Sequence, residues 1–166
     1  METLSFKPIS TVAKESLQYI KNRKEKKVVS LKSRWNKFNR ATGGIEPNMI
    51  FTIAGISGAG KSAFVNSLVF DLIDLNPDQD IVVLYFSLEM VDYRNVGRAI
   101  SSKVRKSVSE LYSANETLSD EDFSKVKSAA NILAGYPIYF VDSACTVEQI
   151  EQTIDYFHEN VAVDKW

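Results

Sequence analysis

One eight-residue stretch restricts the possible folds of this chain more than any other feature. Gly55-Ile56-Ser57-Gly58-Ala59-Gly60-Lys61-Ser62 matches the phosphate-binding loop pattern, in which a glycine and four further residues precede Gly-Lys-Ser or Gly-Lys-Thr. The apolar run 49–54 comes directly before it and is predicted to be a buried strand. Residues 61–75 follow with the apolar spacing of a helix. Because a strand before the loop and a helix after it are the context that this motif requires, a chance glycine-rich turn is a poor alternative.

The residue types of this loop suit the binding of a nucleotide. Glycines permit backbone conformations and close approaches that a side chain would block, and the N–H groups at a helix start face an anion. In such a loop the Lys61 ammonium reaches the β- and γ-phosphates, and the Ser62 hydroxyl is a magnesium ligand. We therefore predict ATP and Mg²⁺ as cofactors, with binding residues Gly55, Ser57, Gly58, Ala59, Gly60, Lys61, Ser62 and Ala63.

The rest of the chain alternates predicted strands and helices. Apolar runs 81–86 and 137–141 are two further strand candidates, apolar on both faces, which is typical of a parallel sheet covered by helices. Residues 27–45 are expected to be rich in loops, with Trp35 and Phe38 as packing residues. Helices are predicted over 8–26, 91–104, 120–134 and 147–160, with Ser119 as an N-cap and Thr146 and Gln149 as a capping box.

Composition and charge exclude several classes of protein. The 166 residues, 45% apolar and 25% charged, fit one globular domain, and no apolar run has the length of a membrane span. A single cysteine, Cys145, cannot form an internal disulfide, so a reducing cytoplasm is expected. Residues 1–40 hold 11 Lys/Arg against 3 Asp/Glu, whereas 41–166 hold 9 against 18. This basic arm indicates either a solvated helix or contact with nucleic acid or an acidic partner.

Two acidic residues follow predicted strands. Glu89 lies where the carboxyl end of a parallel strand meets a ligand crevice, so it could position or deprotonate a water against the γ-phosphate. The spacing equally allows a Glu that caps the next helix. Asp142 could anchor magnesium or simply start a turn. The only histidine, His158, is expected at an exposed helix end, so neither a zinc site nor a Cys145 nucleophile is predicted.

In this order, the motifs resemble the RecA-like ATPase domain of DnaB-type replicative DNA helicases. Residues 38–44 are similar to the family's Leu-Asp-x-x-Thr-Gly-Gly segment, with Asn39 in place of the usual Asp, and Asn48 replaces a usual Gly. Phe86-Ser87-Leu88-Glu89-Met90 is similar to the family's Phe-Ser-Leu-Glu-Met and is the most specific element. Arg98 falls where the family places an arginine, and 118–123 and 137–142 follow in the family's order. The resemblance spans about residues 35–150.

This resemblance implies an α/β, RecA-like P-loop NTPase fold with Glu89 and Lys61 as catalytic residues. Residues 1–30 are expected to form a basic linker helix that docks on a neighbouring subunit, and 31–166 a partial ATPase domain. The family's magnesium-binding Asp strand, DNA loops and arginine finger are expected beyond Trp166, which makes Asp142 a weak candidate. The isolated chain is therefore expected to be inactive.

The function implied is an ATP-driven DNA helicase that translocates as a homo-hexamer on single-stranded DNA. Primase or other replisome proteins are further implied partners, no membrane is involved, and the location is the cytoplasm, that of the host if a phage encodes the chain. A recombination-type RecA-like ATPase is one alternative, although it predicts other residues after the second strand. A nucleotide-binding module without turnover is another.

Overall fold

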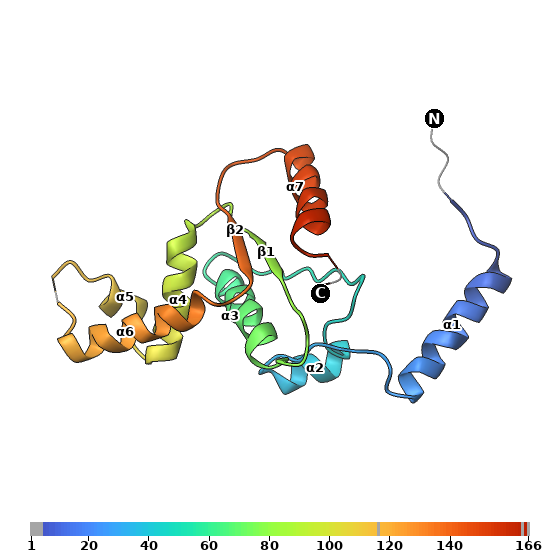
Figure 1. Ribbon diagram of the computed structural model, residues 1–166, viewed down its shortest axis with the longest axis horizontal. Coiled ribbons are helices and arrows are strands. Elements are labelled where there is room, and N and C mark those ends of the chain that lie inside the picture. Colours follow the sequence, from blue (N-terminus) through green and yellow to red (C-terminus); the bar gives the residue numbers. More distant parts are fainter. Residues whose placement is uncertain (1–4, 116, 164, 166) are drawn as a thin grey trace.

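A computed structural model describes residues 5–115, 117–163 and 165. Figure 1 shows a central pair of strands with helices around it and the first helix set apart at one end. Along the chain lie α1 (Ile9–Lys24), α2 (Asn36–Thr42), α3 (Lys61–Asp74), β1 (Val83–Phe86), α4 (Asp92–Val104), α5 (Val108–Leu111), α6 (Asp120–Leu133), β2 (Ile138–Val141) and α7 (Val147–Asn160). None of the helices in these ranges is long and apolar enough to cross a membrane.

The two strands are parallel, with Val83 opposite Ile138, and helices cover both of their faces. Side chains alternate between the faces of a strand. Ile138 packs against the apolar core that Phe70 of α3, Ala99 of α4 and Leu133 of α6 form. The next residue, Tyr139, places its ring centroid 5.1 Å from that of Phe157 in α7. The predicted α/β class, a parallel sheet flanked by helices, is thus confirmed.

The prediction of a strand over 49–54 is wrong. This run has no regular secondary structure and belongs to neither strand of the described sheet, and Ile50 is 94% exposed. Its apolar composition predicted burial, whereas a strand also needs a neighbour that accepts and donates backbone hydrogen bonds. Within the run, the Phe51 ring centroid lies 5.8 Å from that of Phe38. The described sheet therefore has two strands instead of the expected three.

Local sequence rules predicted the helix starts well. The Ser119 side chain accepts a hydrogen bond from the N–H of Asp122, which caps α6. Thr146 and Gln149 form the predicted capping box of α7. These side chains satisfy N–H groups that a helix start otherwise leaves unpaired, so they determine where α6 and α7 begin.

The segment before the phosphate-binding loop is more ordered than predicted. It contains helix α2, and an isolated antiparallel bridge joins Leu31 to Ile45. The Trp35 ring stacks on that of Phe64 in α3 at 4.5 Å between centroids, which confirms its packing role. Asn39 uses both polar atoms of its side chain, accepting from the N–H of Ser33 and donating to its carbonyl. The Asn at this position therefore supports the turn, because an ionised Asp has no donor for that carbonyl.

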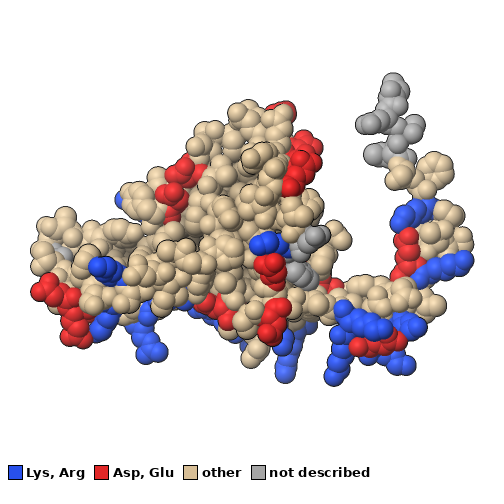
Figure 2. Space-filling view, viewed as in Figure 1, with Lys and Arg blue, Asp and Glu red and all other residues tan. Residues whose placement is uncertain are grey.

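Helix α1 stands apart from the rest of the molecule. None of its residues is buried, and Lys and Arg side chains gather along its lower side in Figure 2. One carboxylate of the main body holds it: Glu46 accepts from Arg23 at 2.7 Å and from the Tyr19 hydroxyl at 2.5 Å. The division into a linker helix over 1–30 and an ATPase domain from 31 stays a prediction.

Candidate nucleotide-binding site

The phosphate-binding loop leads directly into α3, as predicted. Gly58 and Gly60 have φ of +78° and +87°, a left-handed conformation that favours glycine. Gly60 is the N-cap of α3 and no side chain caps the helix there. The N–H groups of the first turn therefore point into the loop without side-chain partners, which suits an anion.

Glycine at position 55 permits a close approach across the loop. A Cβ there would lie 3.2 Å from the Cβ of Ala59, tighter than ordinary contact. The Lys61 ammonium lies across the same loop and donates to the carbonyls of Gly55 at 3.0 Å and Ile56 at 3.2 Å. Ser57, Ser62 and Ala63 are exposed. The loop is thus open to a ligand, and its lysine is held by neutral carbonyls that a phosphate oxygen could replace.

The structure brings Ser62 and Glu89 to one hollow. A depression of about 240 Å³ lies between the start of α3 and the end of β1. The helix-cap interpretation of Glu89 is not observed, because α4 has Val91 as its N-cap and Asp92 as its first acidic residue. Glu89 is exposed and forms no ion pair within the described ranges. The hollow is lined by Ser62, Tyr85, Phe86, Ser87, Leu88, Glu89, Met90 and Asn95.

A buried hydrogen-bonded chain beside this hollow was not predicted. Asn95 of α4, 1% exposed, donates from Nδ2 to the Ser87 hydroxyl at 2.7 Å. Asn66 of α3 donates to the side-chain oxygen of Asn95 at 3.3 Å and to its carbonyl at 3.2 Å. The Ser87 hydroxyl donates to the Met90 carbonyl and so closes the turn that carries Glu89. One signal in the sequence could have indicated it: Asn66 lies four residues after Ser62, on the same face of the helix.

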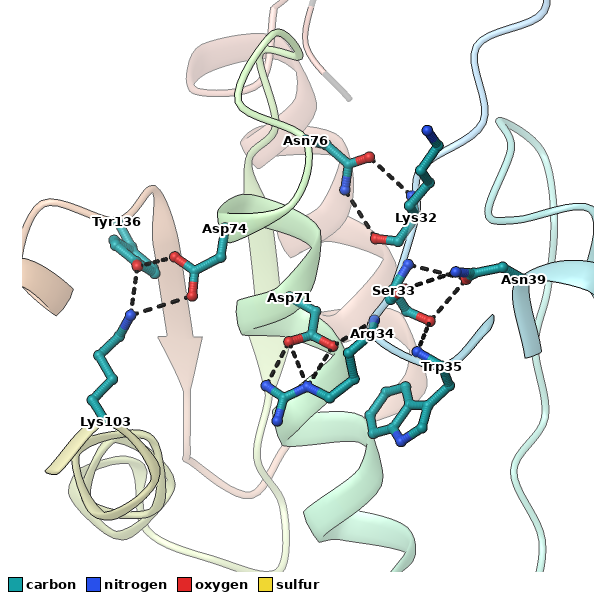
Figure 3. Close-up of polar contacts among 10 residues, drawn as sticks. All are labelled: Lys32, Ser33, Arg34, Trp35, Asn39, Asp71, Asp74, Asn76, Lys103 and Tyr136. Carbon is teal, nitrogen blue, oxygen red and sulfur yellow. Dashed lines mark hydrogen bonds and ion pairs between the residues drawn. The ribbon is translucent and has the colours of Figure 1, made fainter. Parts of the chain in front are cut away.

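The other end of α3 is held by charged and polar side chains (Figure 3). Asp71, 3% exposed, accepts from the Arg34 guanidinium and from the Arg34 N–H at 3.0 Å. Asp74 accepts from Lys103 of α4 and from the Tyr136 hydroxyl. The hydrogen bond to Tyr136 and the charge of Asp74 raise the pKa of Lys103. The far end of the helix that follows the phosphate-binding loop is therefore held through two carboxylates, Asp71 and Asp74.

Other predicted candidates lie away from the hollow. Asp142 is exposed after β2 and does not line it, and His158 is exposed in the last turn of α7. Arg98 lines a second cavity of about 320 Å³ between α3 and α4. Burial raises the pKa of Tyr85 and the charge of Arg98 opposes this. Within the described ranges no three His, Cys, Asp or Glu side chains are grouped to hold a metal ion.

Comparison with solved structures identifies the class of fold. An ATPase domain superposes with a TM-score of 0.73 at 24% identity, over 89% of this chain and 52% of that one. A DnaB-like replicative helicase, described together with its interactions with primase, gives 0.69 at 23% identity, over 93% of this chain and 40% of that one. The fold is that of a RecA-like ATPase domain.

The sequence comparisons identify the family. The model of the DnaB-like helicase C-terminal domain matches residues 30–164. This chain therefore belongs to the family of DnaB-like helicase C-terminal domains. It is 25% identical over 136 residues to the replicative DNA helicase DnaB of Buchnera aphidicola subsp. Baizongia pistaciae, and 31% identical over 99 residues to a probable replicative DNA helicase of Guillardia theta. The two matches include 82% and 60% of this chain. They span only 28% and 16% of the lengths of the two relatives.

Proposed function

We propose that this chain supplies the ATP-binding part of a replicative DNA helicase that moves along single-stranded DNA as a homo-hexamer. The observation that carries the proposal is the hollow shared by Ser62 and Glu89, beside a loop whose helix start has no side-chain cap and whose lysine is held by loop carbonyls. A recombination-type ATPase is a weaker candidate, because the chain belongs to the DnaB-like family.

The residues present fit Mg²⁺-ATP. The positive φ of Gly58 and Gly60 and the missing Cβ of Gly55 leave room for phosphate oxygens against the backbone. Lys61 would leave the loop carbonyls to neutralise phosphate charge, and the Ser62 hydroxyl would be a magnesium ligand. Bound in this way, ATP supplies a γ-phosphoryl group for transfer to water. Glu89 would hold that water and accept its proton.

Two substitutions test the nucleotide site. Lys61→Ala should weaken binding of a fluorescent ATP analogue about 100-fold, since an ammonium–phosphate contact contributes on the order of 3 kcal/mol. Lys37→Ala, an exposed lysine of α2, is the matched control and should bind normally. Normal binding by Lys61→Ala would reject the assignment of the loop.

Glu89→Gln separates binding from hydrolysis. In the complete protein it should bind the analogue normally, while single-turnover hydrolysis of labelled ATP falls by about 100-fold or more. Equal loss of binding in Glu89→Gln and Lys61→Ala would mean that Glu89 has a structural role. A complete protein that binds ATP without hydrolysing it would instead favour the alternative of a nucleotide-binding module.

The partners belong to the same proposal. The exposed apolar residues of α1, among them Leu17 at 68% and Ile20 at 59%, would dock on a neighbouring subunit of the hexamer. Leu17→Glu should then lower the sedimentation coefficient of any assembly that the wild type forms, and an unchanged value would exclude this docking. Single-stranded DNA would be the substrate, primase a further partner, and the cytoplasm the location.

A further inference from the structure

We infer that Asn95 is a positioning residue, which holds the turn carrying Glu89 at a set distance and orientation from the helix carrying Lys61 and Ser62. The inference rests on the proposed function, since it takes Glu89 as the group that acts on water and α3 as the helix that binds phosphate. It adds a residue that none of the motifs contains.

Asn95 lies between two functional segments. Its amide donates to Ser87, which begins the Glu89 turn, and its oxygen atoms accept from Asn66 of α3. Asn66 and Ser62 are four residues apart on one face of α3, and Ser62 lines the hollow. A movement of the turn relative to the phosphate-binding helix therefore has to stretch or break this chain.

This chain of hydrogen bonds is buried. Asn66, Ser87 and Asn95 are 4%, 7% and 1% exposed, so a lost hydrogen bond leaves a buried polar group without its partner. A buried polar group without a partner costs about 1–3 kcal/mol, and this penalty favours the single arrangement in which all three side chains are paired. Each of the three side chains is paired within the described residues.

The hydrogen bonds of Ser87 have a defined direction. The Ser87 hydroxyl accepts from Asn95 and donates to the Met90 carbonyl, which lies one residue beyond Glu89. Because a hydroxyl has only one proton, acceptance from Asn95 leaves that proton for Met90. Asn95 thus acts on Glu89 indirectly, by fixing the donor and acceptor of the group that closes the turn. Glu89 itself stays exposed toward the hollow.

The test measures where the Glu89 carboxylate lies relative to bound nucleotide. The probe is a non-hydrolysable ATP analogue with Mg²⁺, added to the whole chain labelled with ¹³C at glutamate Cδ. The Glu89 resonance is assigned by its absence from Glu89→Gln. In the wild type this resonance should shift on binding, because the carboxylate lies at the mouth of the phosphate site.

Asn95→Leu and Ser87→Ala break the chain at different places, and Ser87→Ala is the milder change should Asn95→Leu not fold. Both should lose about half or more of the shift, since active-site groups need support to within about 0.5 Å. Affinity for the analogue should change less than about threefold, because the loop itself is untouched. Asn76→Ala is the matched control. Beyond the opposite end of α3 it removes one hydrogen bond from the Lys32 N–H and the bonds that Asn76 donates to the carbonyls of Lys32 and Leu72, and it should keep the full shift.

Each result decides the matter. A full shift in Ser87→Ala or Asn95→Leu overturns the positioning role and leaves the nucleotide site intact. Loss of the shift in Asn76→Ala as well overturns it too, because the effect is then general destabilisation. A wild type that binds no analogue, or binds it without any shift of Glu89, rejects the proposed function and this inference with it.

Discussion

Helices α1 and α3 have similar lengths, 16 and 14 residues, and opposite relations to the rest of the molecule. Helix α3 buries Asn66, Leu68, Phe70 and Asp71, whereas α1 buries none of its residues. A short helix is stabilised mainly by the surface that it packs against. Apolar spacing therefore shows which side of a helix can be buried. It does not show whether the chain supplies the surface that buries that side.

The largest expected effect comes from one substitution made in both helices. Leu68→Ala in α3 should lower the free energy of unfolding by about 3 kcal/mol, because it opens a cavity at a site only 8% exposed. Leu17→Ala in α1, at a site 68% exposed, should change it by less than about 0.5 kcal/mol. Urea unfolding followed by circular dichroism measures both as shifts of the midpoint at constant slope. Similar losses in the two variants would show that α1 is packed in solution.

A smaller effect is expected from the ion pairs of the two helices. Asp71→Ala should cost about 2 kcal/mol, because it leaves the Arg34 N–H and guanidinium without the carboxylate, although the Arg34 side chain is half exposed to water. In α1, Glu15→Ala removes an exposed ion pair with Lys7, which precedes the helix. It should cost less than about 0.5 kcal/mol of stability. The same urea titration compares them. An equally large loss for Glu15→Ala would contradict the difference between the helices.

The loop before α3 should respond to backbone strain alone. At Gly58 a Cβ would have no heavy atom within 4 Å, so Gly58→Ala should cost about 1 kcal/mol through its left-handed φ of +78°. Gly135→Ala is the control, since its Cβ would make only an ordinary contact, 3.5 Å from the Ile132 carbonyl, and it should be neutral or slightly stabilising. Thermal unfolding distinguishes the two. A neutral Gly58→Ala would mean that the loop relaxes at no cost.

Local rules predicted the parts of this fold that depend on neighbouring residues. The loop and α3, the caps Ser119 and Thr146, and the strands near 81–86 and 137–141 all follow from short motifs or apolar runs. The run 49–54 failed because apolar composition indicates burial and carries no information about a hydrogen-bonding neighbour. Helix α5 (Val108–Leu111) was not predicted, since four residues are too few to show a period.

The candidate site was predicted only as far as its motifs extend. Lys61, Ser62 and Glu89 were named from the sequence, and the structure places Ser62 and Glu89 at one hollow. Asn95 could not be named, because its importance depends on α3, α4 and the end of β1 meeting in space. The same holds for Arg34 and Asp71, which are 37 residues apart and pair across the fold.

The smallest effect concerns the hydrogen bond that joins α1 to the body. The bond to Glu46 raises the pKa of Tyr19 above its ordinary value of 10.0, and the charge of Arg23 partly opposes this. The folded state therefore holds the Tyr19 proton more tightly than the unfolded chain does. This contribution to α1 attachment is complete below pH 10 and is lost as the pH rises through the folded pKa of Tyr19.

Absorbance at 295 nm, titrated for the wild type and for Tyr19→Phe, isolates this one tyrosine in the difference curve. The midpoint of that curve should lie above 10, the ordinary value for tyrosine. Glu46→Gln should move the midpoint back toward that value, since the amide carries no charge that disfavours a tyrosinate. A midpoint at or below 10 would show that the Tyr19 hydroxyl does not bond to Glu46 in solution. The ion pair between Arg23 and Glu46 would then be left to hold α1 to the body, and the contrast with the buried face of α3 would be larger.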